Sequence, residues 1–225
     1  MLAIKFIRLV PLVFSICLLV AIYFYPGGNI HNDSQIGYSF THNFLSDLGG
    51  YESHSGEVNF LSSFFFSFSL FIFGFAGIAF LFIPKIFKKN NINYFLAVTG
   101  SIFFMFGSIF FAGVGLTPHD LYLETHIFFA INAFRLLVPA SLLYLIVLYR
   151  SEVDKYFSLI LLFLFISTFS YVVYQLSGGN PLENIDEMIR QATIQKMIVF
   201  VNIFSIFFIS FAFSQQSERN KLLNK

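Results

Sequence analysis

The chain has 225 residues, of which 57% are hydrophobic and only 11% are charged, and its mean hydropathy is +0.76. Soluble domains carry roughly 25% charged residues, so this composition excludes an ordinary soluble domain and predicts a membrane protein. The formal net charge is +1 and the basic residues are scattered rather than clustered, which argues against nucleic-acid binding. The single cysteine, Cys17, excludes an intrachain disulfide.

Six apolar segments are each long enough to form a helix across a hydrocarbon layer of about 30 Å. They cover residues 6–25, 58–83, 94–114, 125–149, 156–175 and 192–213. The first follows a basic start, as in a signal peptide, but no small-residue cleavage pattern ends it, so we expect it to remain as a helix. The pattern predicts an all-α fold: one domain over residues 1–225, a polytopic bundle of six transmembrane helices.

The lysine and arginine positions predict how this bundle is oriented. Ten of the thirteen basic residues fall on one side of a six-helix arrangement: Lys5, Arg8, Lys85, Lys88, Lys89, Arg150, Lys155, Arg219, Lys221 and Lys225. Because short basic loops stay in the cytoplasm, we expect both termini there. Without a retention or transit signal, the plasma membrane is the default location. Nine of the twelve acids and all five histidines fall on the opposite, outer side.

The longest polar interruption, residues 26–57, contains the sequence His-Asn-Phe-Leu-Ser-Asp-Leu-Gly-Gly at positions 42–50. Phe44, Leu45 and Leu48 are too apolar for a freely solvated loop, which favours a segment that folds back over the bundle. A Ser-Asp pair followed by two glycines is suited to a short cap or a re-entrant turn whose backbone is satisfied inside the protein.

Asp47 is the acid of that turn, and two roles are open for it. We expect the turn to close the outer mouth of the bundle and to bring Asp47 towards Arg135, His119 or His126. The alternative is that Asp47 only caps the turn. Arg135 should need an anionic partner, because it lies deep in the fourth apolar segment. A charge is costly at such a depth and usually marks a site or a buried ion pair. Asn132 lies on nearly the same side of that segment.

The third loop of the chain, residues 115–124, carries Thr117-Pro118-His119-Asp120, which is typical of a helix start. Thr117 would be the N-cap, Pro118 the first helical residue, and Asp120 would reach back to the cap. On one continuous helix His119 and His126 would share a stripe, but they would lie roughly 10 Å apart along the axis. That spacing is too long for one metal ion unless the chain breaks between the two histidines.

The chain resembles a family of six-helix bacterial and archaeal membrane proteins known as domain of unknown function 998. The resemblance rests on Tyr-Pro-Gly-Gly at 25–28, Asn-Phe-Leu-Ser-Asp-Leu-Gly at 43–49, and Gly-Leu-Thr-Pro-His-Asp at 115–120 ahead of His126. It covers almost the whole chain and implies the six-helix fold, but no settled reaction. A more distant likeness to Frag1/DRAM/Sfk-type eukaryotic membrane proteins suggests a lipid-linked role.

Three functions are consistent with these features. The first is binding of a lipid headgroup or small ligand in an outer polar pocket, with Arg135 as an anion partner. The second is a membrane-embedded hydrolase or transferase, with Arg135 steadying a developing negative charge. The third is a small transporter, for which only Arg135, Asn132 and Asn202 lie deep enough. No nucleophile motif or phosphate loop is present, and the oligomeric state is open.

Each function has its own candidate residues. Those for ligand binding are Ser46, Asp47, Glu124, Asn132 and Arg135. Those for catalysis are Asp47, His119 and His126. A divalent metal such as zinc is the candidate cofactor, and the candidate ligands are His42, His119, Asp120 and His126.

Overall fold

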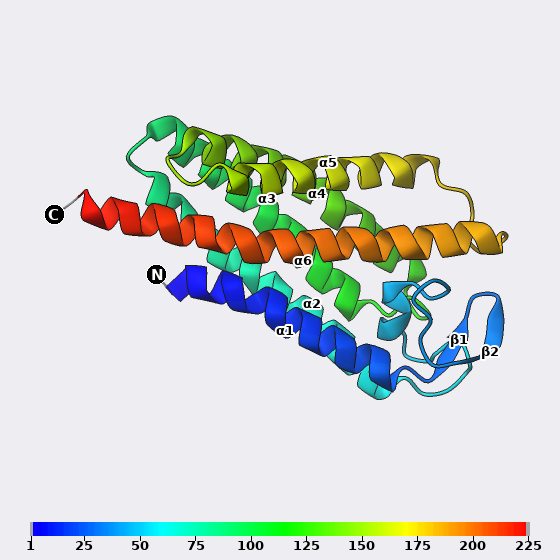
Figure 1. Cartoon of the computed structure of the whole chain (residues 1–225). Coiled ribbons are helices and arrows are strands. Elements are labelled where there is room, and N and C mark those ends of the chain that lie inside the picture. Colours follow the sequence, from blue (N-terminus) through cyan, green and yellow to red (C-terminus); the bar gives the residue numbers. More distant parts are fainter. Residues whose placement is uncertain (1, 224–225) are drawn as a thin grey trace.

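Six long helices form one bundle in the computed structural model, which describes residues 2–223 (Figure 1). They are α1 (Leu2–Phe24), α2 (Phe60–Phe80), α3 (Asn91–Leu116), α4 (Leu123–Arg150), α5 (Tyr156–Ser177) and α6 (Ile185–Leu222). All six are long and apolar enough to cross a membrane, which confirms the prediction of an all-helical bundle with six candidate membrane-spanning helices. A turn of 3-10 helix, η2 (Ile83–Phe87), follows α2.

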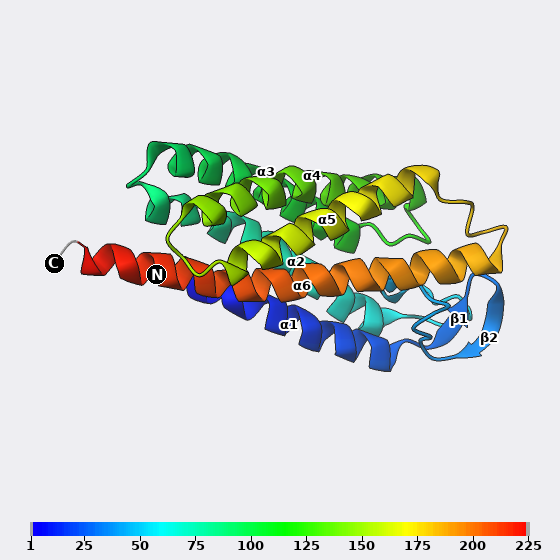
Figure 2. The same cartoon turned by 45° about the horizontal axis from the view of Figure 1, so that its top comes forward.

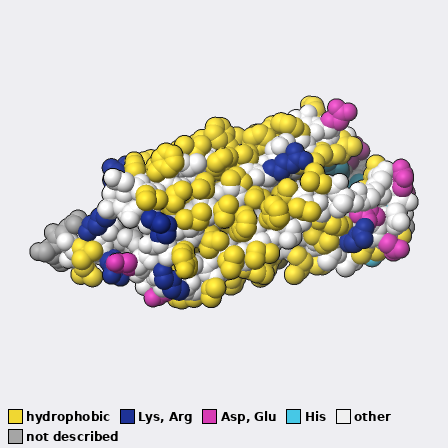
Figure 3. All heavy atoms as spheres, turned by 90° about the horizontal axis from the view of Figure 1, so that it is seen from above, with side chains coloured by type: hydrophobic (Ala, Val, Ile, Leu, Met, Phe, Trp, Pro, Cys, Tyr) yellow, Lys and Arg dark blue, Asp and Glu magenta, His cyan; other side chains and the backbone are white. Residues whose placement is uncertain are grey.

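The surface of the bundle is divided along its length. A broad band of hydrophobic side chains covers its middle, and most of the basic side chains on the face shown gather towards the end that carries the C-terminus (Figure 3). Acidic and histidine side chains lie at the other end, where the chain between α1 and α2 and the α5–α6 connection are found (Figures 1 and 3). The predicted separation of charge is therefore present along the bundle axis.

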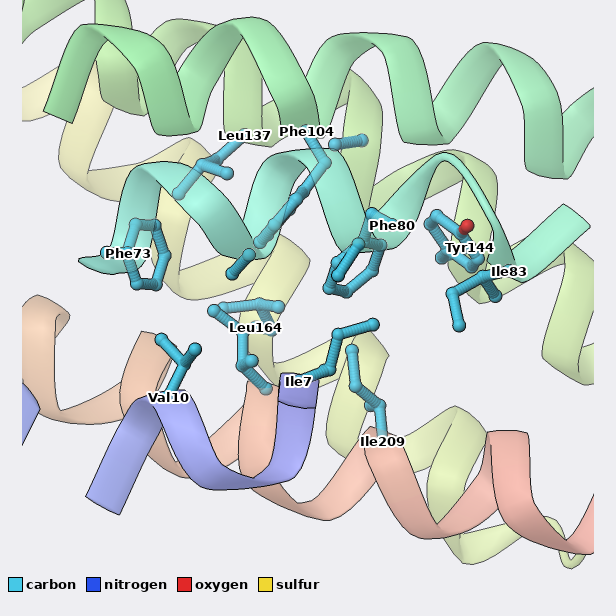
Figure 4. Close-up of a cluster of buried hydrophobic side chains, with 14 of the residues drawn as sticks. Ile7, Val10, Phe73, Phe80, Ile83, Phe104, Leu137, Tyr144, Leu164 and Ile209 are labelled. Atoms are coloured by element: carbon cyan, nitrogen blue, oxygen red, sulfur yellow. The ribbon is translucent and has the colours of Figure 1, made fainter. Parts of the chain in front are cut away.

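Aromatic and branched side chains from all six helices fill the core (Figure 4). The rings of Phe80 on α2 and Phe104 on α3 stack with centroids 3.8 Å apart. Tyr144 on α4 is buried beside them, and its hydroxyl group lies 2.6 Å from that of Ser101. Phenol groups in an apolar core need such a partner, so this hydrogen bond fixes the register of α3 against α4.

The last helix is longer than predicted. The predicted segment began at residue 192, but α6 begins at Ile185, because the Asn184 side chain accepts hydrogen bonds from the backbone N–H groups of Asp186 and Glu187. Two acids in the first turn also suit the positive end of the helix dipole. The polar first turns of α6, residues 185–191, were therefore wrongly predicted to belong to a loop.

The predicted helix start at Thr117 is wrong. The α3 helix continues to Leu116, and the Thr117 hydroxyl group donates to the carbonyl oxygen of Gly113, so Thr117 ends one helix instead of beginning the next. The α4 helix begins only at Leu123. Pro118 is suited to a position just after a helix end, where its missing N–H group is not needed. Residues 117–122 thus form a turn that interrupts the helical path.

Residues 25–59 fold into a compact structure that we call the outer cap, where outer denotes the end of the bundle away from the two termini. It contains the two-stranded antiparallel sheet of β1 (Gly27–Asn29) and β2 (Asn32–Ile36) and the 3-10 helix η1 (Leu45–Gly49). Figures 1 and 2 show it at the end of the bundle away from the termini. Leu45 and Leu48 are buried, as expected for a segment that closes the bundle.

Polar side chains from α2 and α6 attach the outer cap to the bundle. The Ser62 hydroxyl group of α2 donates to the carbonyl oxygen of Leu48. The Lys196 ammonium group of α6 donates to the carbonyl oxygen of Asn43, and the side-chain oxygen of Gln195 accepts from the backbone N–H of Leu45 at 2.7 Å. These bonds satisfy backbone groups that have no sheet or helix partner, so η1 is held in a fixed position.

Candidate metal centre

Three side chains from three separate segments meet beneath the outer cap. Asp47 comes from η1, His54 from the cap segment before α2, and His119 from the α3–α4 turn. One potential ligand atom of each residue lies within 4.8 Å of the corresponding atoms of the other two. The closest measured approach joins Nε2 of His54 to Oδ1 of Asp47, at 3.5 Å. We call these three residues the His-Asp triad.

Within residues 2–223, the hydrogen bonds to the Asp47 carboxylate all reach one of its two oxygens. Oδ2 accepts hydrogen bonds of 3.0 Å from the side-chain amide of Asn43 and from the backbone N–H of Phe44. Asp47 is 3% exposed, so these bonds compensate for burial of the charge. Oδ1 is left facing His54. This is how a metal-binding carboxylate is oriented by its surroundings.

His54 depends on a close backbone approach in the outer cap. Gly28 has φ +78°, and a Cβ atom there would lie 2.3 Å from the backbone nitrogen of Ser55. Only glycine lets the strand lie this close to the segment that carries His54. The Asp47 carboxylate raises the pKa of His54 above its ordinary value, while burial opposes this shift and the charge of Asp120 adds to it.

Two ring nitrogens of the triad are buried without a hydrogen bond. Nε2 of His54 and Nδ1 of His119 have no hydrogen-bond partner within residues 2–223. Gly50 lets the ring of His119 pack against the cap, since a Cβ atom there would lie 2.9 Å from Cε1 of that ring. Buried polar atoms are nearly always paired, so two such nitrogens beside a carboxylate are suited to bind a metal ion or another ligand.

Asp120 ties the α3–α4 turn to the outer cap. Its carboxylate accepts hydrogen bonds from the backbone N–H groups of Tyr51 and Glu52, at 3.0 and 2.9 Å. Partial burial acts to raise the pKa of Asp120, but these two bonds outweigh it and hold the pKa below its usual value. Asp120 was a candidate metal ligand and is not one of the triad. It positions the neighbouring His119 instead.

His126 lies next to the triad, on the first turn of α4. Its ring centroid is 6.1 Å from that of His119, which is possible because the chain breaks its helix between the two residues. Nδ1 of His126 lies 2.7 Å from the carbonyl oxygen of Thr117. A carbonyl oxygen only accepts, so the proton of the neutral ring is on Nδ1 and the lone pair is on Nε2.

The triad faces a hollow of about 660 Å³, which we call the outer pocket. Its lining includes Asp47, His54, His119, Asp120 and His126 on one side. On the other side it is lined by the outer ends of α5 and α6 and the connection between them, including Tyr171, Gln175, Asn180, Gln191 and Gln195. The volume is within the range of small-molecule sites.

The structure does not bring Arg135 to Asp47. Arg135 lies on the exposed side of α4, and among residues 2–223 it forms no ion pair. Asn132 is occupied within its own helix, where its amide group donates to the carbonyl oxygen of Phe128. The expected Asp47–Arg135 pair is therefore not formed, because position 135 faces away from the bundle.

Two other candidates also lie away from the triad. Glu124 is exposed on the first turn of α4 and does not line the outer pocket. Nδ1 of His42 lies 2.8 Å from the hydroxyl oxygen of Thr41 and 3.3 Å from that of Ser39. Ser46, by contrast, does line the outer pocket.

His54 was not among the site residues predicted from the sequence. Its position seven residues after Asp47 in the same loop could have indicated that the two side chains lie close together.

The triad has the donor set of a metal site with one open side. Two imidazole nitrogens and one carboxylate oxygen are ligands that zinc and similar divalent ions favour. Tetrahedral ligands at 2.0–2.2 Å from a metal ion lie roughly 3.4 Å from one another. The His54–Asp47 distance already matches. The other ligand atoms lie within 4.8 Å of one another, so they would have to approach by at most about 1.4 Å. Three protein ligands with an open position are typical of catalytic sites rather than structural ones.

Gly28 provides a test of how the outer cap positions His54. We expect Gly28→Ala to lower the thermal unfolding temperature of the detergent-solubilised protein and to weaken metal binding, because a Cβ atom would collide with backbone. Gly37→Ala is the matched control, since Gly37 also has a positive φ, of +64°, but nothing lies within 4 Å of its Cβ position. Both variants carry a backbone cost of about 1 kcal/mol. Equal losses would show that the close approach does not matter.

The chain was also compared with known proteins. No family model, curated protein or solved structure matches it.

Proposed function

We propose that this chain is a membrane-embedded hydrolase that uses a divalent metal ion at the outer face of the plasma membrane, with both termini in the cytoplasm. The observation that carries the proposal is the convergence of Asp47, His54 and His119, with unpaired nitrogens, at the wall of the outer pocket. The gathering of basic residues at the terminal end supports the orientation. We further propose that the chain belongs to the family of six-helix membrane proteins whose motifs it resembles.

The geometry supports hydrolysis for two reasons. A divalent ion at the triad would supply Lewis-acid activation of water and of a carbonyl or phosphoryl oxygen. His126 presents an unprotonated Nε2 next to the triad, as a general base requires, because Thr117 holds its proton on Nδ1. Asn43 and the Phe44 amide orient the carboxylate, which supplies the outer-shell support that such sites need.

Binding of a lipid headgroup without chemistry is the second candidate. It is favoured by the size of the outer pocket and by the amide side chains on its α5–α6 side, which suit hydrogen bonding to an uncharged ligand. Under this alternative the metal ion would hold the ligand or the cap in place and would not activate water.

The test begins with metal analysis of the protein purified in mild detergent. We expect about one zinc or similar ion per chain in the wild type, and a loss of affinity well beyond the roughly 10- to 100-fold typical of outer-shell changes in His54→Ala. His31→Ala is the control, because His31 is exposed and outside the triad. A wild type without metal, or a His54→Ala variant that binds it normally, would contradict the proposal.

Activity then separates the two candidate functions. We expect the metal-loaded protein to hydrolyse 4-nitrophenyl acetate, to lose this activity with a chelator and to regain it with zinc. A metal-loaded protein that binds lipid but hydrolyses neither this ester nor a lipid ester would support the binding function and overturn the enzymatic one.

A further inference from the structure

Three neighbouring hollows in this protein lie between the outer surface of α1 and α6 and the triad, and each shares lining residues with the next. The outer pocket shares Ser46, His126, Ala130 and Gln195 with an inner cavity of about 70 Å³ that extends into the bundle. This cavity shares Leu45, Val199 and Ile203 with a groove of about 490 Å³ between α1 and α6. We call the inner cavity the chain cavity, and we call the groove between α1 and α6 the portal groove.

The chain cavity is apolar and lies directly inward of the triad. Its walls are mainly the side chains of Phe14, Phe66, Phe73, Phe111 and Phe134. The amide group of Asn202 at its wall is already hydrogen bonded to the carbonyl oxygen of Ile198. Such a space stays dry and accepts hydrocarbon rather than water. Its volume suits a few methylene groups, so the rest of an acyl chain must lie elsewhere.

The portal groove is large enough to hold the rest of the acyl chain. The α1 and α6 helices touch near the terminal end, where the Arg8 guanidinium group donates to the hydroxyl group of Ser210 at 3.0 Å. They diverge towards the outer cap in both views (Figures 1 and 2). The groove between them opens on the outside of the bundle and is lined mainly by apolar side chains, such as Leu12, Leu19 and Phe200. The charged residue in its lining, Lys196, already donates to the carbonyl oxygens of Asn43 and Ala192. The shared residues Leu45, Val199 and Ile203 make this groove the lateral route by which a lipid chain would approach the chain cavity.

The charge of the outer pocket selects among lipid headgroups. The residues that line it include two acids, Asp47 and Asp120, but no lysine or arginine among residues 2–223. In the metal-free protein an anionic phosphate would meet two carboxylates and no lysine or arginine, and a divalent ion at the triad would only balance those two charges, so the pocket offers no net positive charge to an anionic headgroup. The amide of Gln175 suits a hydroxyl or amide group, because its Oε1 is buried without a hydrogen-bond partner among residues 2–223. Gln191 and Gln195 already use part of their amides on Gly179, Glu187 and the Leu45 N–H.

We propose that the substrate is an acyl lipid with an uncharged headgroup, whose chain lies in the portal groove and chain cavity while its carboxylic ester or amide lies at the triad. This inference rests on the proposed hydrolase. In the reaction, the water oxygen bonds to the acyl carbon and the bond from that carbon to the headgroup breaks. One water proton passes through Nε2 of His126 to the released alcohol or amine, and the fatty acid gives its proton to solvent.

The activity test uses one substitution at two positions. Val199 on α6 lines both the portal groove and the chain cavity, whereas Val173 on α5 is exposed and lines neither. We expect Val199→Phe to lower hydrolysis of a monoacylglycerol with a long chain by about tenfold or more, as expected when a chain loses its apolar pocket. Hydrolysis of 4-nitrophenyl acetate should fall far less, so that the ratio of the long-chain rate to the acetate rate drops in Val199→Phe, whereas Val173→Phe should change neither rate. Equal loss of both substrates in Val199→Phe, with normal unfolding, would overturn the proposal.

A second measurement needs no activity. Metal-free wild-type protein is exposed to a monoacylglycerol that carries a photoreactive diazirine at the chain end, with excess unlabelled lipid as competitor. We expect cross-links on Phe14, Phe73, Val199 or Ile203, and displacement by monoacylglycerol but not by lysophosphatidic acid of the same chain length. Cross-links without any hydrolysis would reject the hydrolase and keep the lipid site. Hydrolysis without these cross-links, or equal competition by the anionic lipid, would reject this inference alone.

Discussion

Asp47→Asn is expected to abolish stoichiometric metal binding and ester hydrolysis while leaving the outer cap folded. An asparagine side-chain oxygen can still accept the two hydrogen bonds that Oδ2 of Asp47 receives from Asn43 and Phe44. It cannot supply the anionic oxygen that faces His54, and a carboxylate is a much stronger ligand for a divalent ion than a neutral amide. The loss of metal affinity should therefore exceed the roughly 10- to 100-fold caused by outer-shell changes.

Two further variants separate the ligand role of Asp47 from its structural role. Asp47→Ala removes the acceptor as well and leaves the Asn43 amide and the Phe44 N–H without their partner, so it should lower both metal content and unfolding temperature. Asp33→Asn makes the same charge change at an exposed position of the cap and should alter neither. Isothermal titration with zinc and thermal unfolding in detergent measure the two effects. If Asp47→Asn retained wild-type affinity, Asp47 would be a turn residue only.

Much of this architecture follows from sequence patterns. Six apolar segments of sufficient length predict the six helices, and the apolar residues Leu45 and Leu48 inside a polar loop predict that the loop covers the bundle. Both features depend on the burial of apolar side chains. The contributions of these side chains add along the chain, so they can be judged from a short segment of sequence. The predicted approach of Asp47 to His119 depends on the same burial, and the structure places a potential ligand atom of each within 4.8 Å of the other.

The partners within the site were harder to predict, because they depend on backbone details. Whether His119 and His126 lie apart on one helix or side by side depends on where α3 ends, and Thr117 fits either a cap or an end. Arg135 illustrates the opposite error. A charge in an apolar segment suggests a buried site, yet its direction depends on helix rotation, and at position 135 the side chain faces outward. His54 was missed because its position depends on the conformation of Gly28.

Asn59 holds the cap in place, and its removal should have the largest effect on stability. Asn59 is 1% exposed and immediately precedes α2. Its side-chain amide donates to the carbonyl oxygens of Leu48 and Gly50, at 3.1 and 3.0 Å. Asn59→Ala leaves both carbonyl groups buried with fewer partners, and each such loss costs about 1–3 kcal/mol. We expect destabilisation of about 2–4 kcal/mol and an unfolding temperature lower by on the order of 5–10 °C.

The control for Asn59→Ala is Asn32→Ala, the same change at an exposed position of β2, which should shift the unfolding temperature little. Metal binding provides the sharper criterion. Because Asn59 positions η1 and hence Asp47, a triad that binds metal must be coupled to the fold of the cap. Zinc at 100 times its dissociation constant stabilises the folded state by about 2.7 kcal/mol, so it should recover much of the loss in Asn59→Ala. Coupling is reciprocal, so the variant should also bind zinc more weakly than wild type. An Asn59→Ala protein that is destabilised as expected, but that zinc neither stabilises nor binds less tightly, would show that cap and metal site are independent.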